Sequence, residues 1–269
     1  MATQIWYHAH CMDGLGAAWA AHNHFKDSAV YIPVQYGDPY PEVRENDSIF
    51  ILDFSYPREV LMEIAAKAGW VTVIDHHKTA QKDLERFSLP NVTIDFNMEY
   101  SGAFLAWALF MSYEKNFPTL IYYVQDRDLW KWELPHSKEV SAYLGHKNWS
   151  IEDLYNLEVL VESALEEVVA MGSVLLAYQD TLVDRIANNV FLTEIDGVQV
   201  PTVYSPVFQS ELGDKISVGH PFAAVIMVLS ETEEVVSLRS QVDGADVGVI
   251  AKKFGGGGHV HAAGFKRSK

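Results

Sequence analysis

Three short apolar runs each stop at residues that commonly bind metal ions. These residues are His8, His10, Cys11 and Asp13 in IWYHAHCMDG, Asp53 in IFILDFS, and Asp75, His76 and His77 in VTVIDHH. Carboxylates that are crowded together repel one another and are costly to bury unless a cation lies among them. The residue types and their spacing therefore favour a site for one or more divalent metal ions.

Each of these residues has an ordinary explanation when it is taken alone. An aspartate after a strand usually caps a turn or a helix, and a histidine beside apolar residues usually packs in the core. Three such run ends in one chain are better explained by a shared site. Asp95 in VTIDFN also ends an apolar run, and we interpret it as a simple cap.

A further acidic pair follows the apolar run in IYYVQDRDLWKW. Asp126 or Asp128 could face the metal ions, and a surface ion pair with Arg127 is the alternative. The aromatic residues of this stretch could stack on bases, but a role in the core explains them more simply.

The elements that must position these residues alternate between strand and helix. Apolar runs predict strands at 4–8, 29–36, 48–54, 70–75 and 92–96, and helices are predicted at 14–25, 57–69, 79–87 and 101–113. Unbroken hydrophobic strands between helices indicate a parallel sheet covered on both faces. Ligands of such sheets bind beyond the carboxyl ends of the strands, where the acids and imidazoles lie.

The second half of the chain predicts a different arrangement. Residues 118–188 look mostly helical, and 151–189 should form one long helix or two. A hairpin with its turn at Asp196-Gly197 comes next, followed by paired strands in FAAVIMVLS and EVVSLRSQ and a helix at 246–254. We therefore expect an α/β protein with a catalytic domain at 1–150, a helical linker at 151–189 and a smaller α/β domain at 190–269.

The C-terminal GGGGHVHAAG is the remaining unusual stretch. Four consecutive glycines weaken any helix or strand, so an unusual backbone conformation or a close approach is expected to require them. Exposed amides there could bind phosphate oxygens, although no Lys-Ser or Lys-Thr follows as in a triphosphate-binding loop. A flexible tail is the alternative.

Composition narrows the class of substrate and the compartment. The 20 Lys and Arg against 36 Asp and Glu give a net charge of −16, and no basic stripe for long nucleic acids is present. An anionic substrate should therefore be small. One cysteine, no apolar run of membrane length and no signal-peptide pattern lead us to expect a cytoplasmic protein with no membrane partner.

Together these motifs resemble the DHH phosphoesterase family, which is named after the triplet seen here at Asp75-His76-His77. The end of the chain resembles the family's associated C-terminal domain, whose GGGH-x-x-AAG signature matches residues 256–264. The resemblance implies a parallel-sheet domain that holds two Mn²⁺ ions and faces a smaller domain across the active-site cleft, with Mg²⁺ or Co²⁺ as possible substitutes.

The resemblance also implies a role for individual residues. The implied metal ligands are His8, Asp13, Asp53, His76 and Asp126, with Asp53 bridging the two ions. His77 would face the substrate phosphate, and Asp75 belongs with it to the catalytic motif. The implied substrate-binding residues are Arg239, Ser240, Gly256, Gly257, Gly258 and His259.

The first motif departs from the family pattern of two aspartates two residues apart. Asp13 matches the second aspartate, and Cys11 stands at the position of the first. Either His10 or Cys11 could join the ligands of His8, and a cysteine ligand would favour softer metals such as zinc. The alternative is that Cys11 is a small buried residue beside the site.

The resemblance implies hydrolysis of a phosphate ester by a water that the metal ions activate. We favour cleavage of short oligoribonucleotides or linear dinucleotides to mononucleotides, as in nanoRNase-like enzymes. A phosphatase for pAp, a polyphosphate-cleaving enzyme and a non-catalytic nucleotide-binding protein are the alternatives. An amidohydrolase barrel, suggested by His8-Ala9-His10, would need eight strand–helix units. The oligomeric state stays open, with a homodimer among the options.

Overall fold

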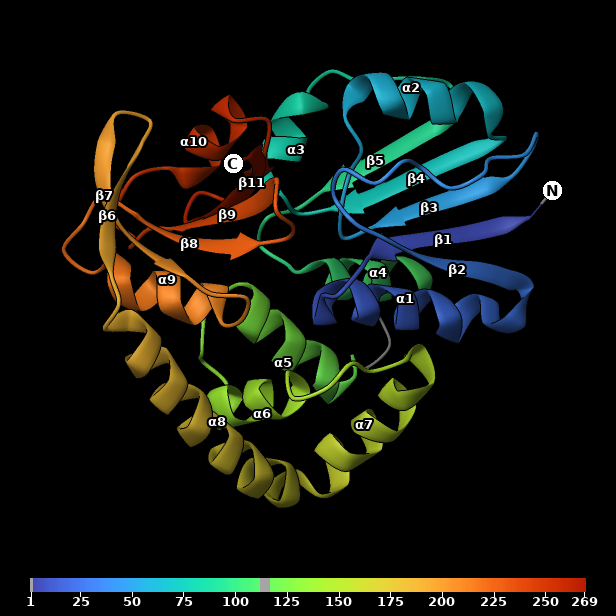
Figure 1. The fold of residues 1–269 in the computed structure, drawn as a ribbon. Coiled ribbons are helices and arrows are strands. Elements are labelled where there is room, and N and C mark those ends of the chain that lie inside the picture. Colours follow the sequence, from blue (N-terminus) through green and yellow to red (C-terminus); the bar gives the residue numbers. More distant parts are fainter. Residues whose placement is uncertain (1, 112–116) are drawn as a thin grey trace. The chain divides into compact units, whose positions relative to one another are not determined.

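The protein is described by a computed structural model that covers residues 2–111 and 117–269. The chain divides into two compact units, Met1–Leu176 and Ala177–Lys269 (Figure 1). The boundary falls inside helix α8 (Leu165–Ala187). The stretch predicted as one long helix or two forms two helices, because Ala164, which follows α7 (Ile151–Ser163), has a φ of −142° that is not helical.

The first unit contains a parallel sheet, as the sequence predicted. Its described strands are β1 (Thr3–His8), β2 (Ala29–Val34), β3 (Ser48–Leu52), β4 (Trp70–Asp75) and β5 (Val92–Phe96). Within the described residues they lie in the order β2-β1-β3-β4-β5, and every neighbouring pair is parallel. The chain order reverses between β1 and β3, and in an open sheet such a reversal creates a crevice at the carboxyl ends of the strands.

Helices cover both faces of this sheet (Figure 1). The described helices of the unit also include α1 (Met12–Phe25), α2 (Arg58–Lys67), α3 (Lys78–Asp83), α4 (Gly102–Met111), α5 (Thr119–Asp128) and α6 (Ser137–Leu144), with a short 3₁₀ turn at Lys26–Ser28. Side chains alternate along each strand, so Ile5 packs in the core with α1 and α4 while Trp6 packs with α2. The predicted end of the fourth helix, at 113, lies outside the described residues.

Helices α1 and α4 cross closely enough to exclude a larger residue. A Cβ atom added at Gly16 of α1 would lie 2.8 Å from the Cβ of Ala103 in α4. Ala17, Ala18 and Ala20 of α1 are fully buried around the same contact. Small residues therefore bring the start of α4 close to the end of β1, where the candidate ligands lie.

The second unit contains a mixed sheet. Its described strands are β6 (Phe191–Ile195), β7 (Val198–Tyr204), β8 (Ala223–Val228), β9 (Glu233–Arg239), β10 (Gly257–Gly258) and β11 (Ala262–Ser268). Their order is β10-β11-β9-β8-β7-β6, and β7 and β8 pair in parallel. The predicted hairpin is confirmed, since Asp196 and Gly197 join β6 to β7 with φ values of 51° and 77°.

Two elements of the second unit were not predicted. Helix α9 (Gln209–Ser217) is mostly polar and buries Leu212 and Ile216 against one face of the sheet. Strand β11 (Ala262–Ser268) carries Lys266 and Arg267 near its end, so its sequence resembles an exposed tail. The predicted helix at 246–254 is α10 (Val247–Lys253), which packs on the opposite face. In the part of the chain that the structure describes, no helix is long and apolar enough to cross a bilayer.

Candidate metal centre

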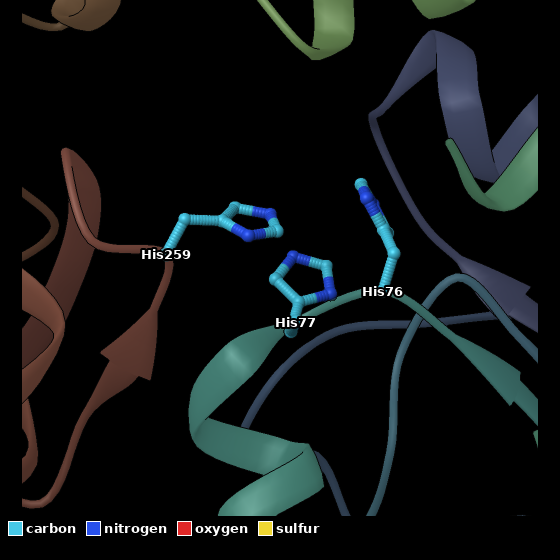
Figure 2. Close-up of side chains that lie close together, drawn as sticks. All are labelled: His76, His77 and His259. Atoms are coloured by element: carbon cyan, nitrogen blue, oxygen red, sulfur yellow. The ribbon is translucent and has the colours of Figure 1, made fainter. Parts of the chain in front are cut away.

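The carboxyl ends of β1, β3 and β4 bring predicted ligands together in the first unit. His8 is the last residue of β1, Asp53 directly follows β3, and His76 directly follows β4. Asp53 Oδ2 lies 3.4 Å from His8 Nδ1, and Asp53 Oδ1 lies 3.1 Å from His76 Nε2. Figure 2 shows the imidazoles of His76 and His77 between the end of β4 and the start of α3. Asp53 thus lies between two groups of side chains.

Each group has three potential ligand atoms within 4.8 Å of one another. One group is His8, Cys11 and Asp53, and the other is Asp13, His76 and Asp128. In the second group, His76 Nε2 lies 3.5 Å from Asp13 Oδ2 and 3.5 Å from Asp128 Oδ2. The structure therefore brings His8, Asp13, Asp53 and His76 together as predicted and adds Cys11 and Asp128.

Asp53 is held in an uncommon backbone conformation. Its φ is 65°, in the left-handed region that aspartate tolerates better than most residues, and its amide donates to Ile74 O at 2.9 Å. Gly102, the first residue of α4, packs directly on it. A Cβ atom added at Gly102 would lie 2.5 Å from Asp53 Oδ1. Gly102 is a site residue that sequence reasoning missed.

The start of α4 also fixes Asp13. The Asp13 carboxylate accepts hydrogen bonds from Gly102 N at 2.6 Å and Ala103 N at 2.9 Å. These are amides of the first helical turn, which favours a negative charge. Burial, together with the charges of Asp53 and Asp128, nevertheless raises the pKa of Asp13 well above its ordinary value.

The electrostatics of the centre call for added positive charge. Burial lowers the pKa of His76, but its hydrogen bond with Asp53 and the charges of Asp128 and Asp13 raise it to about 10. Burial raises the pKa of Asp53, and the imidazoles of His76 and His8 outweigh burial and lower it. A proton on His76 thus partly balances three neighbouring acids.

Two carboxylate oxygens of the centre also lack hydrogen-bond donors. Asp53 Oδ2 and Asp128 Oδ2 are buried and accept no hydrogen bond from residues in the described ranges. Buried carboxylate oxygens without donors are costly unless a cation is bound. The donor set of carboxylates, imidazoles and one thiol therefore fits divalent transition metals.

Asp75 acts on His77 and does not belong to either ligand group. Its Oδ1 accepts hydrogen bonds from His76 N at 2.7 Å and His77 N at 3.2 Å, and lies 2.7 Å from His77 Nδ1. Its Oδ2 accepts one from Ser55 Oγ at 2.6 Å. Burial lowers the pKa of His77, but the charge of Asp75 and its hydrogen bond raise it. Asp75 is a positioning residue, and Ser55, which supports it, was missed.

The prediction of Asp126 as a ligand is corrected by the structure. The Asp126 carboxylate accepts hydrogen bonds from Glu133 N at 3.0 Å, Leu134 N at 3.3 Å and Ser137 Oγ. It therefore shapes the segment after α5. Residues two apart on a helix point about 200° apart, so Asp126 and Asp128 cannot both face the metal centre.

The other open choices at the strand ends also receive an answer. His10 is exposed, has a φ of 57° and belongs to neither ligand group, whereas Cys11 lies in the His8 group. Asp95 is exposed at the end of β5 and lies outside both groups. Sequence spacing alone could not separate Cys11 from His10.

The predicted substrate-binding residues lie on the second unit. Arg239 ends β9 and donates to Ser210 Oγ at 2.9 Å, while Ser240 is buried and donates to Ala245 O at 2.7 Å. Ser240 Oγ also lies 3.0 Å from His261 Nδ1, a partner that the sequence did not reveal. His259 lies on the turn between β10 and β11 and donates its amide to Ala262 O at 2.8 Å. Their binding role remains a prediction.

The glycine run has a structural reason. Gly257 and Gly258 form β10 and pair with Gly264 and Ala263. A Cβ atom at Gly256 would lie 2.0 Å from Gly264 O, and one at Gly258, where φ is 141°, would lie 2.5 Å from Ala262 O. Close backbone approach therefore requires glycine here, as the sequence predicted, and the flexible-tail alternative is excluded.

Comparison with known proteins adds relatives at two levels of similarity. No family model matches the chain. The chain is 31% identical over 285 residues to the uncharacterized protein R106 of Acanthamoeba polyphaga mimivirus, covering 97% of this chain and 66% of that protein. It is 26% identical over 247 residues to the oligoribonuclease NrnB of Bacillus subtilis, covering 83% of this chain and 60% of NrnB. The chain thus spans less than two thirds of the length of either relative.

A solved structure supports the fold. The pGpG-specific phosphodiesterase PggH from Vibrio cholerae matches with a TM-score of 0.50 and 14% identity, covering 100% of this chain and 94% of PggH. In this chain, the parallel sheet has acids and imidazoles at its carboxyl ends. A second, mixed sheet follows it along the sequence. With Asp75 at the end of β4, His76 and His77 directly after it, and an oligoribonuclease among the proteins that it matches, the chain is similar to the DHH phosphoesterase family.

Proposed function

We propose that the protein is a metal-dependent phosphodiesterase that hydrolyses short oligoribonucleotides or linear dinucleotides to mononucleotides. The observation that carries the proposal is the position of Asp53 between two groups of ligand atoms, where one carboxylate can serve two cations. The relatives support the substrate class, since one is named an oligoribonuclease. Mn²⁺ is the proposed ion, because carboxylates and imidazoles predominate among the donors.

Each group would hold one ion. His8, Cys11 and Asp53 would bind the first, and Asp13, His76 and Asp128 the second, with Asp53 shared. When bound, divalent cations lower the pKa of a bound water towards neutrality and counter the charge that develops on phosphoryl oxygens.

The remaining residues of the centre orient other side chains or supply charge. Asp75 holds His77 through Nδ1, so that Nε2 of the same ring is directed away from Asp75. Burial lowers the pKa of His77, but the charge of Asp75 and its hydrogen bond raise it, which favours the protonated imidazole beside a phosphate oxygen. The amides at the start of α4 keep Asp13 oriented as a ligand.

The proposal is tested by the products that the Mn²⁺-loaded chain forms. We expect diribonucleotides and trinucleotides to be converted to mononucleotides, and pAp and polyphosphate to be hydrolysed much more slowly. Preferential turnover of pAp or polyphosphate would show that the site acts on that substrate instead. No turnover of any of these, with the metal shown to be bound, would leave a non-catalytic nucleotide-binding protein.

Two variants link that activity to the site. Asp53→Asn keeps a residue that tolerates positive φ but removes the shared charge, so we expect metal stoichiometry to fall and activity to drop at least 1000-fold, or about 4 kcal/mol in activation free energy. Asp95→Asn removes an exposed acid at the end of β5 and should leave both unchanged. Equal effects of the two variants would contradict the assignment.

A further inference from the structure

Arg127, Trp130 and Trp132 form a compact cluster at the end of α5, beside the candidate ligand Asp128 in the sequence. The Arg127 guanidinium carbon lies 4.3 Å from the ring centroid of Trp130 and 5.4 Å from that of Trp132. The two indole rings lie 5.0 Å apart at an angle of 70°. Lys138 Nζ is 5.7 Å from the Trp132 ring. Cations on partly exposed aromatic faces are the residue types that bind single-stranded nucleotides.

The backbone that presents the two indoles is unusual. Trp130 and Trp132 both have a φ of 57°, a conformation that is rare and unfavourable for bulky residues. Asp126 keeps this segment in place, because its carboxylate holds the amides of Glu133 and Leu134 and its carbonyl accepts from Lys131 N at 2.9 Å. Strain of this kind persists when the surroundings enforce it, and it is concentrated at functional sites.

The cluster lies beside the metal centre along the chain. Arg127 directly precedes Asp128, whose Oδ2 lies 3.5 Å from His76 Nε2. Trp132 also lines a surface cavity of about 250 Å³ together with Leu134, His136 and Ser137. In a chain with a net charge of −16, the cluster thus brings cationic and aromatic groups next along the chain to Asp128, a candidate metal ligand.

We propose that Arg127, Trp130 and Trp132 form a nucleotide-binding site, in which the indoles stack on a nucleobase and Arg127 contacts a backbone phosphate of the same oligonucleotide. The site rests on the proposed function and narrows its substrate to esters that carry bases. Polyphosphate offers no π face for an indole to stack on. The competing explanation is that the cation–π contacts only hold the turn between α5 and α6.

Binding separates the two explanations without requiring turnover. The full-length chain is titrated with a non-hydrolysable methylene-phosphonate analogue of diadenylate and with the matching abasic analogue, and tryptophan fluorescence is recorded. We expect saturable quenching by the base-containing analogue and little by the abasic one. Trp130→Ala and Trp132→Ala should each weaken binding of the base-containing analogue by about tenfold, since stacking on an aromatic side chain contributes ~1–3 kcal/mol per base.

Matched variants control for fold and for indole loss. Trp132→Phe keeps an aromatic face and should bind within about threefold of the unchanged chain, whereas Trp70→Ala removes a 44% exposed indole at the start of β4 and should have no effect. Arg127→Gln should weaken both analogues because it removes a phosphate contact. Melting curves establish that each variant is folded.

Two results would overturn the site. One is unchanged affinity in folded Trp130→Ala and Trp132→Ala, and the other is an equal loss of affinity for the base-containing and abasic analogues in these two tryptophan variants. If the alanine variants unfold, absence of quenching in the unchanged chain at saturating analogue would have the same consequence. Failure of hydrolysis with quenching intact would count against the proposed function alone.

Discussion

Cys11 is the residue that sets this metal centre apart from one built only of carboxylates and imidazoles. It lies in the group of His8 and Asp53, and burial together with Asp53, Asp128 and Asp13 raises the pKa of its thiol well above the ordinary value. A thiol in these surroundings stays protonated unless a cation replaces the proton. Metal binding through Cys11 should therefore release a proton.

This leads to a spectroscopic prediction. Co²⁺-loaded protein should show a near-ultraviolet thiolate-to-cobalt charge-transfer band that is absent in Cys11→Ser, and proton release measured by calorimetry in two buffers should be smaller in the variant. Cys11 is the one cysteine of the chain, so the band has a single source. A band of equal intensity in both proteins, or none in either, would remove Cys11 from the ligand set.

Asp75 makes a different contribution at the same scale. It contacts His77 and Ser55 and joins neither ligand group. We expect Asp75→Asn to lower kcat about 10–100-fold, the usual effect of losing a residue that orients a catalytic group, while metal stoichiometry stays the same. Ser55→Ala should give a smaller loss of the same kind. Loss of metal from Asp75→Asn would show that Asp75 acts on the ions instead.

Helix α4 is the element that joins the two ligand groups. Its first amides hold Asp13, and its first residue packs on Asp53. Gly102→Ala would place a Cβ atom 2.5 Å from Asp53 Oδ1, so metal affinity should fall at least tenfold in a folded protein. Metal titration of the variant is the measurement.

Gly145→Ala is a suitable control for that change. Gly145 follows α6 with a φ of −81°, and an added Cβ would be 3.4 Å from its nearest atom, Ser141 O. We expect unchanged metal affinity in this variant. Equal metal affinity in Gly102→Ala and the unchanged protein would contradict the role given to α4.

A second helix start gives a prediction about pH. Thr119 N and Leu120 N of α5 each donate to a carboxylate oxygen of Glu158 at 2.8 Å. Burial and the neighbouring Glu162 raise the pKa of Glu158 from 4.5 to about 7, against the lowering effect of the two amides. A raised acid pKa means that the folded state holds the proton more tightly, so this contribution to stability is greatest below about pH 4.5 and is lost as pH rises to about 7.

Glu162→Gln should remove much of that effect. We expect no change in the free energy of unfolding at pH 4, where Glu158 is protonated and carries no charge for Glu162 to repel, and a gain of about 1 kcal/mol or less at pH 8, because Glu158 is partly solvent-exposed. Denaturant unfolding at both values is the measurement. Glu166→Gln, an exposed glutamate at the start of α8, is the control. A gain that is equal at pH 4 and pH 8 would contradict the explanation.

At the scale of the whole molecule, both ligand groups around Asp53 lie in one of the two compact units. His8, Cys11, Asp13, Asp53, His76 and Asp128 lie in Met1–Leu176. Mn²⁺ alone should therefore slow amide hydrogen exchange at the ends of β1, β3 and β4 and at the start of α4. Exchange in β6 to β9 should be unchanged. Equal protection of both sheets by the metal would show that metal binding also depends on the second unit.

The sequence by itself determined the strand–helix alternation, the parallel sheet and the turn at Asp196-Gly197. These follow from local periodicity and turn chemistry, which act over a few residues. It also placed His8, Asp53 and His76 at strand ends, and parallel strands bring such ends to one edge of a sheet.

Only the tertiary structure decided which neighbouring side chains meet there. The rotation of α5 turns Asp128 towards His76 and Asp126 towards the next loop. The turn at His10 leaves that ring exposed and Cys11 beside Asp53. The packing of Gly102 on Asp53 joins residues 49 positions apart. These choices depend on contacts between distant segments, and neither propensity nor motif spacing contains that information.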